Sequence, residues 1–413
     1  MLPVALTAQV ATTPGQTLGI SAFNQSFRDG LNINHSQLSG AYMIATFLAS
    51  LPIFFIGALM DRYGIRRVMT VVVICLGGAC FFIARAHSLV TLFMAFCLLR
   101  VFGHGALPLL ADNTLAMWFR KRLGTVSGLK NLGITCTVMS VPPLFLWLIH
   151  TFGWREAFAI LGLGVWALML PLLLLVFRNR PEEIGQVIDG MRNVPPCQSP
   201  DASTEPPTTA SVSLDLKAAA RTRAFWILLA QHGIWGLMWA GVIFNITPLF
   251  QSRGLTDNQA AATFVTLGLC MALMQLIGGF MADRLPLNLL LAAAVAAKAV
   301  GLIFLLSMNR VWTAHAYAAV FGVGQGLAAV VGSTIWARYF GRDHLGKIRA
   351  CAQTATVAAS SLGPFLMAAA YDQFQSFVPP LLLFLALTPP LVVALLFATP
   401  PQRVKRKRMS NVQ

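Results

Sequence analysis

The sequence predicts an all-α membrane protein with about twelve transmembrane helices in two pseudo-symmetric six-helix bundles. The prediction rests on composition, on the spacing of apolar segments and on an internal repeat. Of the 413 residues, 57% are apolar and only 11% are charged, whereas a soluble domain carries roughly a quarter charged residues. The composition therefore excludes a soluble globule, a disordered chain and a secreted disulfide scaffold, and makes the lipid bilayer an expected partner.

Twelve apolar segments, separated by charged clusters or turn residues, are each long enough to cross a bilayer as a helix, which takes about 20 residues. Their approximate ranges are 3–27, 37–60, 67–85, 89–118, 123–151, 155–177, 224–250, 259–282, 287–308, 312–337, 347–371 and 377–399. The polar stretch between the sixth and seventh segments is rich in Pro, Ser and Thr and predicts a flexible linker. We expect an N-terminal bundle (1–178), a linker (179–223), a C-terminal bundle (224–400) and a basic tail (401–413).

The formal charge of +16 comes from short basic clusters between the apolar segments, a pattern typical of membrane orientation rather than of nucleic-acid binding. Twenty-two Lys and Arg residues fall on one side of the predicted membrane and five on the other. We therefore expect a cell-membrane protein with both termini and the linker in the cytoplasm. The dispersed cysteines predict no metal site and no cofactor. The first segment lacks a basic start, so we expect no cleaved signal peptide.

An internal repeat supports the division into two halves. The segment 57–62 matches 279–284, with the same spacing of Gly, Asp and Arg, and Gly124 matches Gly346. Both pairs have an offset of 222 residues. Two equivalent halves around an axis normal to the membrane are one of the plans on which transporters are built.

The loop expected between the second and third helices carries the strongest local motif, which we interpret as a conformational latch. Its glycines would allow a close helix contact and a sharp turn, and Asp61 would accept hydrogen bonds from a helix N-terminus or pair with a cation. The alternative is a positive-inside turn with an incidental acid. The second copy has Pro286 and Asn288 in place of Gly64 and Arg66 and should form a weaker latch. The predicted latch residues are Gly57, Asp61, Arg62, Gly64, Arg66, Arg67, Asp283 and Arg284.

This motif resembles the signature of the major facilitator superfamily between its second and third helices. The fourth-helix pattern of that family is similar to RVFGHG at 100–105. The branch that holds monocarboxylate transporters and oxalate:formate exchangers resembles this chain at WFRKRLG (118–124), GWR (153–155) and PEEIG (181–185). The resemblance covers nearly the whole chain. It implies the major facilitator fold and a secondary transporter working by alternating access, not an enzyme.

Two positions depart from that branch. Its eighth helix commonly carries a substrate-binding arginine eight residues before the acid of the second motif, where this sequence has Gln275. The eleventh-helix lysine of the oxalate exchangers falls near Thr356. A small organic anion such as a carboxylate is the first expected substrate. Efflux of an amphipathic or drug-like compound is the alternative, and a non-transporting membrane sensor is a rival of another class.

Charged residues inside the predicted helices mark further candidates, because burying one in hydrocarbon costs at least about 2.5 kcal/mol. Arg100 falls in the middle of the fourth helix, where it would attract an anion or take part in coupling; a structural pair is the alternative. His104, one turn later, is a candidate for a coupled proton, with a neutral hydrogen-bonding group as the alternative. For Lys298 in the ninth helix the options are snorkelling, a local pair or a function. Lys130 and Asp112 are expected to pair.

Polar and aromatic residues at helical spacing suggest that the first, seventh and tenth helices form the cavity wall, an assignment that comes mostly from the resemblance. The Pro14-Gly15 pair is expected to break the first helix. The alternative is ordinary helix packing. The predicted cavity residues are Gln9, Thr13, Gln16, Arg100, His104, His232, Trp235, Trp239, Gln275 and Gln325. The expected partner is a small-molecule substrate, with a coupled proton left open, and we expect a monomer that binds no nucleic acid.

Overall fold

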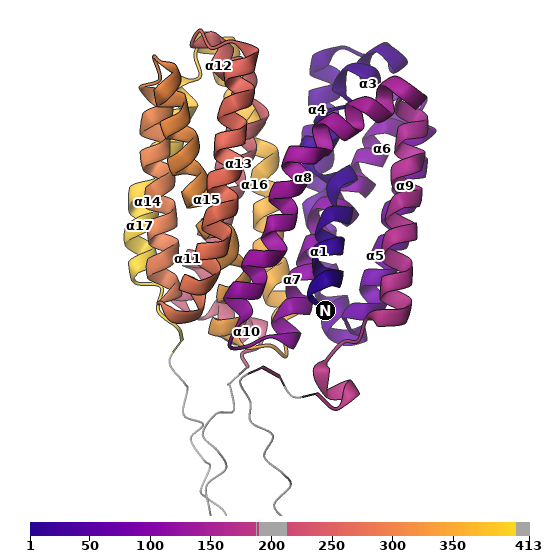
Figure 1. The fold of residues 1–413 in the computed structure, drawn as a ribbon, viewed down its shortest axis with the longest axis vertical. Coiled ribbons are helices and arrows are strands. Elements are labelled where there is room, and N and C mark those ends of the chain that lie inside the picture. Colours follow the sequence, from indigo (N-terminus) through magenta and orange to yellow (C-terminus); the bar gives the residue numbers. More distant parts are fainter. Residues whose placement is uncertain (187, 190–212, 402–413) are drawn as a thin grey trace, which may run out of the picture.

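The computed structural model shows two bundles of long helices that stand side by side (Figure 1). The structure describes residues 1–186, 188–189 and 213–401, and all regular structure among these residues is helical. The N-terminal half consists of α1 (Leu2–Ala11), α2 (Thr17–Ser21), α3 (Asn24–Leu31), α4 (His35–Tyr63), α5 (Ile65–Ala84), α6 (Leu89–Leu99), α7 (Leu107–Trp118), α8 (Leu123–Phe152) and α9 (Trp154–Pro171). The C-terminal half consists of α11 (Arg223–Phe244), α12 (Ile246–Ser252), α13 (Asp257–Arg284), α14 (Leu287–Leu306), α15 (Val311–Phe340), α16 (Leu345–Phe374) and α17 (Val378–Leu396).

The helices account for the twelve expected crossings. Nine helical segments in the described part of the chain are long and apolar enough to cross a membrane. Helices α8 and α16, of 30 residues each, and the broken segment from α1 to α3 bring the crossings to twelve. A π-helical stretch, Arg100–Ala106, joins α6 to α7, and a second one, Leu172–Val176, ends α9.

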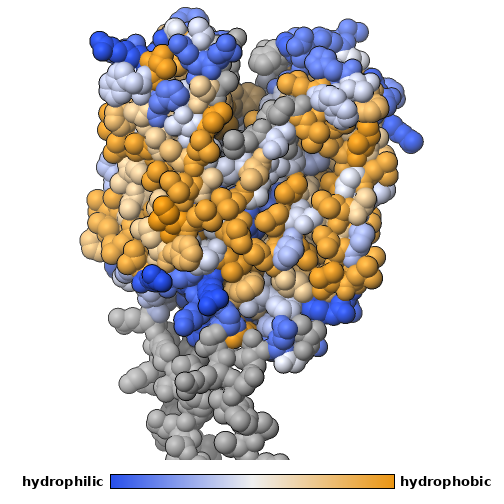
Figure 2. Space-filling view, viewed as in Figure 1, coloured by the Kyte–Doolittle hydropathy of each residue, from blue (hydrophilic) through white to orange (hydrophobic). Residues whose placement is uncertain are grey.

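The face of the molecule in Figure 2 carries a band of hydrophobic residues across its middle, with hydrophilic residues gathered at both ends. Large apolar side chains such as Phe55, Leu175 and Phe397 are more than half exposed. Soluble proteins rarely expose so large an apolar surface, whereas lipid tails cover it at no cost. The predicted all-α membrane protein is therefore confirmed, and it is a multi-pass one.

The first crossing is broken where the sequence predicts a break. Helix α1 ends at Ala11 and a 3₁₀ turn, Thr13–Gly15, follows it, because Pro14 has no N–H to continue the helix. Gly15 lies against the π-helical stretch so closely that an added Cβ would stand 2.7 Å from the Cα of Gly103. Only glycine fits at this contact.

The two halves meet through a reciprocal contact at one end of the molecule, which we call the closed end. Asp61, at the end of α4, accepts hydrogen bonds from the backbone N–H groups of Gly346 (2.9 Å) and Lys347 (2.9 Å) at the start of α16. Asp283, at the end of α13, accepts equivalent bonds at the start of α8, from Gly124 (2.7 Å) and Thr125 (2.8 Å). The same offset of 222 residues relates the two contacts, so the repeat in the sequence corresponds to a pseudo-twofold relation in space.

The glycines of the first motif behave as predicted. An added Cβ on Gly57 would stand 2.5 Å from the carbonyl oxygen of Gly346, so α4 and α16 pack with almost no space between them. Gly64 has φ +84°, which lets α5 begin at the next residue after α4 ends. Arg66 stays within the N-terminal half, where its Nε donates to the Leu173 carbonyl (3.0 Å).

The second contact is the more extensive one, against the expectation of a weaker second latch. Asp283 also accepts a bond from the Thr125 hydroxyl (2.7 Å) and pairs with Arg338 Nη2 (2.5 Å). These partners come from α8 and α15, so the changes at Pro286 and Asn288 do not affect them. Among the other predicted latch residues, Arg62, Arg67 and Arg284 are exposed at the closed end.

The described ends of the segment 179–223 form hydrogen bonds with loops at the closed end. Asp189 accepts hydrogen bonds from the backbone of Lys121 (3.1 Å) and Arg122 (2.9 Å) just before α8. On the far side, Leu214 N–H donates to the Phe340 carbonyl (2.8 Å), and helix α10 (Leu216–Ala220) leads into α11. The rest of the predicted linker and the tail from residue 402 lie outside the described residues.

Candidate substrate-binding site

A cavity of about 260 Å³ lies between the two halves. Residues of the first, fourth and fifth crossings line it on the N-terminal side, and residues of α11, α13, α15 and α16 line it on the C-terminal side. Figure 2 shows the surface hollowed between the halves at the end away from the closed end. The cavity thus has both halves as walls, which is what alternating access requires.

Nine of the ten predicted cavity residues lie on this wall. They are Gln9, Thr13, Gln16, His104, His232, Trp235, Trp239, Gln275 and Gln325. The exception is Arg100, which is not among the residues that line the cavity. The resemblance selected the helices of the wall, and the spacing of polar and aromatic residues selected positions on each helix, because each crossing turns one face toward the other half.

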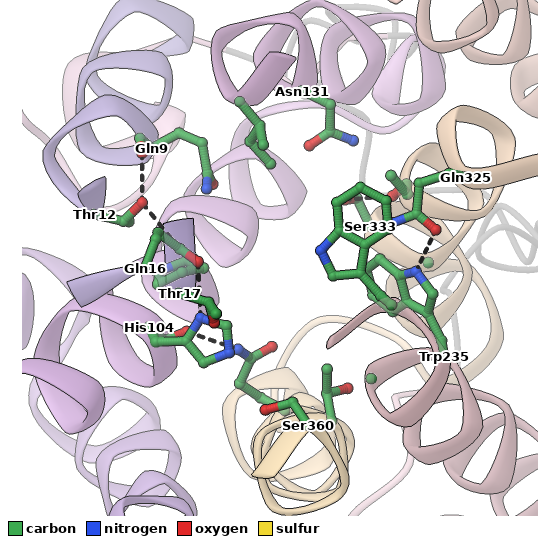
Figure 3. Close-up of a pocket in the computed structure, with 18 of the residues that line it drawn as sticks. Gln9, Thr12, Gln16, Thr17, His104, Asn131, Trp235, Gln325, Ser333 and Ser360 are labelled. Carbon is green, nitrogen blue, oxygen red and sulfur yellow. Dashed lines mark hydrogen bonds between the residues drawn. The ribbon is translucent and has the colours of Figure 1, made fainter. Parts of the chain in front are cut away.

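The N-terminal wall is a chain of polar groups around the break in the first crossing (Figure 3). Gln16 Nε2 donates to the Thr12 hydroxyl (3.1 Å), which in turn donates to the Gln9 carbonyl (2.7 Å). The same Gln16 side chain meets His104 through its Oε1, 2.8 Å from Nδ1. Since an amide oxygen only accepts, Nδ1 carries the proton. The Nε2 atom of His104 is buried and has no partner among the described residues.

The C-terminal wall is aromatic and faces these polar groups across the cavity (Figure 3). Trp235 Nε1 donates to Gln325 Oε1 (2.8 Å), and Trp336 Nε1 donates to His232 Nε2 (3.3 Å). His232 Nδ1 lies 3.0 Å from the Leu228 carbonyl. Because one nitrogen of His232 accepts and the other donates, this histidine is neutral. It links Trp336 of α15 to α11 within the wall.

Arg100 stabilises the broken helix instead of facing the cavity. The side chain is 1% exposed, and its Nη1 donates to the Gly15 carbonyl (3.1 Å) and the Thr17 hydroxyl (3.3 Å). Its guanidinium also lies over the Tyr42 ring, 5.3 Å from the centroid. The break at Pro14 leaves a carbonyl without its helical donor, and Arg100 supplies one. The predicted placement of Arg100 in the cavity is therefore wrong, and the alternative of a structural role describes its contacts.

The charged groups that do line the cavity form a cluster between the halves, which we call the cation cluster: Lys130, Asp112 and Arg349. The expected pair of Lys130 Nζ and Asp112 Oδ1 is present. Arg349 Nη2, from α16 in the other half, meets Asp112 Oδ2 at 2.5 Å. Lys130 is 2% and Arg349 5% exposed. Arg349 Nη1 is buried without a partner among the described residues.

Sequence reasoning missed Arg349 because it counted this residue among the basic residues of a loop. The expected eleventh segment, 347–371, contained the signal that would have found it, because Arg349 falls inside that range. In the structure Arg349 lies in the second turn of α16.

Gln275, where the resembled branch has an arginine, makes a neutral contact between the halves. Its Oε1 accepts a hydrogen bond from the Thr135 hydroxyl of α8 (3.0 Å). Thr356, near the position of the exchangers' lysine, donates to the Ala352 carbonyl (2.9 Å). The branch's cations are absent at both positions, and the cation cluster provides the positive charge of this cavity from other residues.

Two helical bundles related by a pseudo-twofold axis, with a polar cavity between them, are an architecture on which secondary membrane transporters are built. The family model of the Major Facilitator Superfamily matches residues 5–267 and 236–411, almost the whole chain. The chain belongs to this superfamily, as the resemblance in its motifs implied.

Two curated relatives are similar over part of their length. Monocarboxylate transporter 11 of Homo sapiens is 28% identical over 253 residues, 59% of this chain and 48% of the relative. The uncharacterized MFS-type transporter YcxA of Bacillus subtilis is 19% identical over 179 residues, 41% of this chain and 44% of the relative. The chain spans about half the length of these relatives. The similarity to the first supports the monocarboxylate transporter branch.

Two solved structures share the fold along nearly the whole chain. The human organic anion transporter MFSD10 (TETRAN) has a TM-score of 0.68 at 12% identity, with 96% of this chain and 98% of that chain covered. The proton:xylose symporter XylE has a TM-score of 0.70 at 13% identity, with 96% and 94% covered. At these identities the likeness establishes the architecture and not the substrate.

Proposed function

We propose that this protein carries a small organic anion, such as a carboxylate, across the cell membrane by alternating access. The main observation in support is the charge of the cation cluster, in which two buried cations, Lys130 and Arg349, share one carboxylate, Asp112. Arg349 Nη1 remains without an acceptor among the described residues. A buried cation without full pairing is costly, so an anion in the cavity stabilises the cluster.

Size and chemistry favour a small ligand. Pockets for drug-sized ligands measure about 300–1,000 Å³, and this cavity holds about 260 Å³. A guanidinium binds a carboxylate through two parallel hydrogen bonds, which gives geometric selectivity as well as energy. Elsewhere on the cavity wall, His104 and Gln16 offer polar groups, and Trp235 offers an apolar surface for the organic part of the anion.

The contacts at the closed end supply the switch. Asp61 and Asp283 each bind the N-terminus of a helix in the opposite half, and a carboxylate there is stabilised by the helix dipole. Breaking both contacts frees the halves to rock about the cavity and to open this end. We propose that the closed end is cytoplasmic, since the basic clusters lie there, and that the protein works as a monomer.

The names of similar proteins also favour an organic anion as the substrate. A monocarboxylate transporter and an organic anion transporter are among the relatives and structural neighbours. The second candidate function is efflux of an amphipathic compound, which the aromatic wall of Trp235, Trp239 and Trp336 favours. The rival of another class is a membrane sensor that binds a ligand without moving it.

The proposal is tested by thermal-shift measurements on the purified protein against lactate, oxalate, benzoate, organic amines and drug-like compounds. We expect stabilisation by one or more of the carboxylates, and a loss of at least about tenfold in affinity in Arg349→Gln, which is 1.4 kcal/mol. Arg349→Lys should keep part of the affinity because it keeps the charge. Arg85→Gln, an exposed arginine at the far end, is the matched control.

Transport itself is measured in liposomes with the anion that binds. Uptake down an imposed gradient of that anion supports a carrier, whereas binding without any movement of solute would favour the sensor. Stabilisation by amines or drug-like compounds alone, with no response to the carboxylates, would favour the amphipathic-efflux function.

A further inference from the structure

Lys298 is a buried amine that the proposed function does not use. It lies in the middle of α14 and is 3% exposed. None of the three ion pairs in the described part of the chain includes it, and no hydrogen bond from its Nζ is found there. Its side chain has therefore not snorkelled to the polar surface, which is one of the options that the sequence leaves open.

The side chain runs from the outer layer of the C-terminal half toward the cavity wall. The Lys298 side chain passes α15 at Gly324, where the missing side chain leaves room: an added Cβ at this glycine would stand 2.9 Å from Lys298 Cγ. The Nζ atom ends over the ring of Trp235, 5.5 Å from its centroid. Trp235 belongs to the cavity wall and is held by Gln325, so one aromatic ring separates the amine from the cavity.

Among the residues that the structure describes, no carboxylate pairs with Lys298. Its own helix α14 has no other acidic, basic, His, Cys or Tyr side chain, and α17, which packs on α14, has none at all. Helix α15 faces it with Gly324, and α11 faces it with Trp235 and, beyond that ring, with His232. The nitrogens of His232 bind Leu228 and Trp336, so His232 provides no negative charge.

A buried ammonium without a counter-charge is unfavourable, whereas a neutral amine in the same place is not. An anion in the cavity would supply the missing negative charge on the other side of Trp235. Proton and anion would then each favour the binding of the other, since coupling between two sites is reciprocal. A cation over a tryptophan face in a dry environment is favourable as well.

We propose that Lys298 is the site of a coupled proton: its neutral amine takes up one proton when an organic anion enters the cavity and gives it back when the anion leaves. In the step, the lone pair of Nζ accepts a proton from water-borne H₃O⁺, which leaves as water, and no other bond changes. The carrier then moves a monovalent anion and a proton together, without net charge. Because this site needs an anion to pair with, it rests on the proposed function.

The test counts protons during binding. Anion binding to the purified full-length protein is followed by titration calorimetry at one pH in buffers with different ionisation enthalpies, with lactate, oxalate and benzoate as probes. The slope of the observed enthalpy against the buffer enthalpy gives the protons taken up per anion. We expect roughly one for the wild-type protein and roughly none for Lys298→Met and Lys298→Arg, since neither side chain switches its charge.

The two variants separate coupling from folding and from simple attraction. Lys298→Arg keeps a fixed positive charge and should bind the anion within a few-fold of the wild type, whereas Lys298→Met should bind it at least about tenfold more weakly. Lys121→Met, an exposed lysine at the closed end, is the control and should change neither value. Thermal melting of each variant verifies that it is folded.

Three outcomes would overturn the assignment. Wild-type binding without proton uptake means that Lys298 keeps a constant charge, and the anion-transport function would stand without it. Proton uptake that persists in Lys298→Met places the proton elsewhere, with the unpartnered Nε2 of His104 as the next site to test. Failure of all three anions to bind would overturn both the proton site and the proposed function.

Discussion

At the scale of single residues, the chemistry of a side chain in this protein depends on which groups its neighbours leave unpaired. Arg100 and Arg349 are both buried cations in membrane-spanning segments. Arg100 meets a carbonyl freed by a helix break, so its charge is used inside one half. Arg349 shares its only described carboxylate with Lys130, so part of its charge remains available to a ligand.

The first prediction follows from this contrast. Arg100→Gln should lower the stability of the ligand-free protein by about 1–3 kcal/mol, because the Gly15 carbonyl loses its charged donor. The anion affinity of the folded fraction should change little. Thermal melting and anion titration of the same sample measure both effects, with Arg85→Gln as the control. A variant that melts like the wild type but no longer binds the anion would show that Arg100 contributes to anion binding rather than to stability.

At the scale of elements, breaks in the helices are as informative as the helices themselves. The 3₁₀ turn Thr13–Gly15 in the first crossing lies against the π-helical stretch Arg100–Ala106 of the fourth crossing. Two irregular segments thus pack on each other at the depth of the cavity. Irregular backbone at this depth is tolerated where it is buried in protein or lines a cavity. Here Gln16, next to the 3₁₀ turn, and His104, within the π-helical stretch, both line the cavity.

The second prediction tests this packing. Gly15→Ala should destabilise the protein and weaken anion binding, because the added Cβ would stand 2.7 Å from Gly103 Cα, which is backbone and cannot turn aside. Gly78→Ala, within α5, is the matched control, since its Cβ would meet nothing within 4 Å. Melting temperatures of the two variants decide the matter: equal values for both would contradict the close contact between the crossings.

At the scale of the whole molecule, the pseudo-twofold relation means that each half contributes one of the two equivalent contacts at the closed end. Asp61 and Asp283 bind the second and third backbone N–H groups of a helix in the opposite half. The cation cluster adds a charged connection near the cavity, from Asp112 to Arg349. If the halves rock apart at the closed end, as we propose, these charged contacts between them break, which would link the cavity charge to the state of the closed end.

The third prediction compares the two motif acids. Asp61→Asn and Asp283→Asn should both reduce transport while leaving the protein in the membrane, since an amide loses the charge that the helix dipole stabilises, worth about 0.3–2 kcal/mol. The effect of Asp283→Asn should be larger, because Asp283 also pairs with Arg338. Initial uptake rates in liposomes provide the comparison, normalised to the amount of inserted protein. Unchanged rates in both variants would argue against a latch.

The sequence by itself determined the features that depend on one helix at a time. Hydropathy located the twelve crossings, because each must be apolar over the thickness of a bilayer, and Pro14 located the break. The repeat at Asp61 and Asp283 indicated two equivalent halves. The crossings, the break and the repeat follow from local rules of spacing and composition, whereas the nine cavity residues on the wall were found by helical spacing together with the resemblance to the superfamily.

Only the tertiary structure decided which charges face the cavity. Arg100 donates to a carbonyl of another crossing, and Arg349 lies in the cavity wall near the start of α16. The Lys298 side chain passes Gly324 and ends over the Trp235 ring. A cation in a membrane-spanning helix goes to whichever acceptor or ring the neighbouring helices present. That choice depends on contacts between residues far apart in the chain, which the pattern along one helix does not contain.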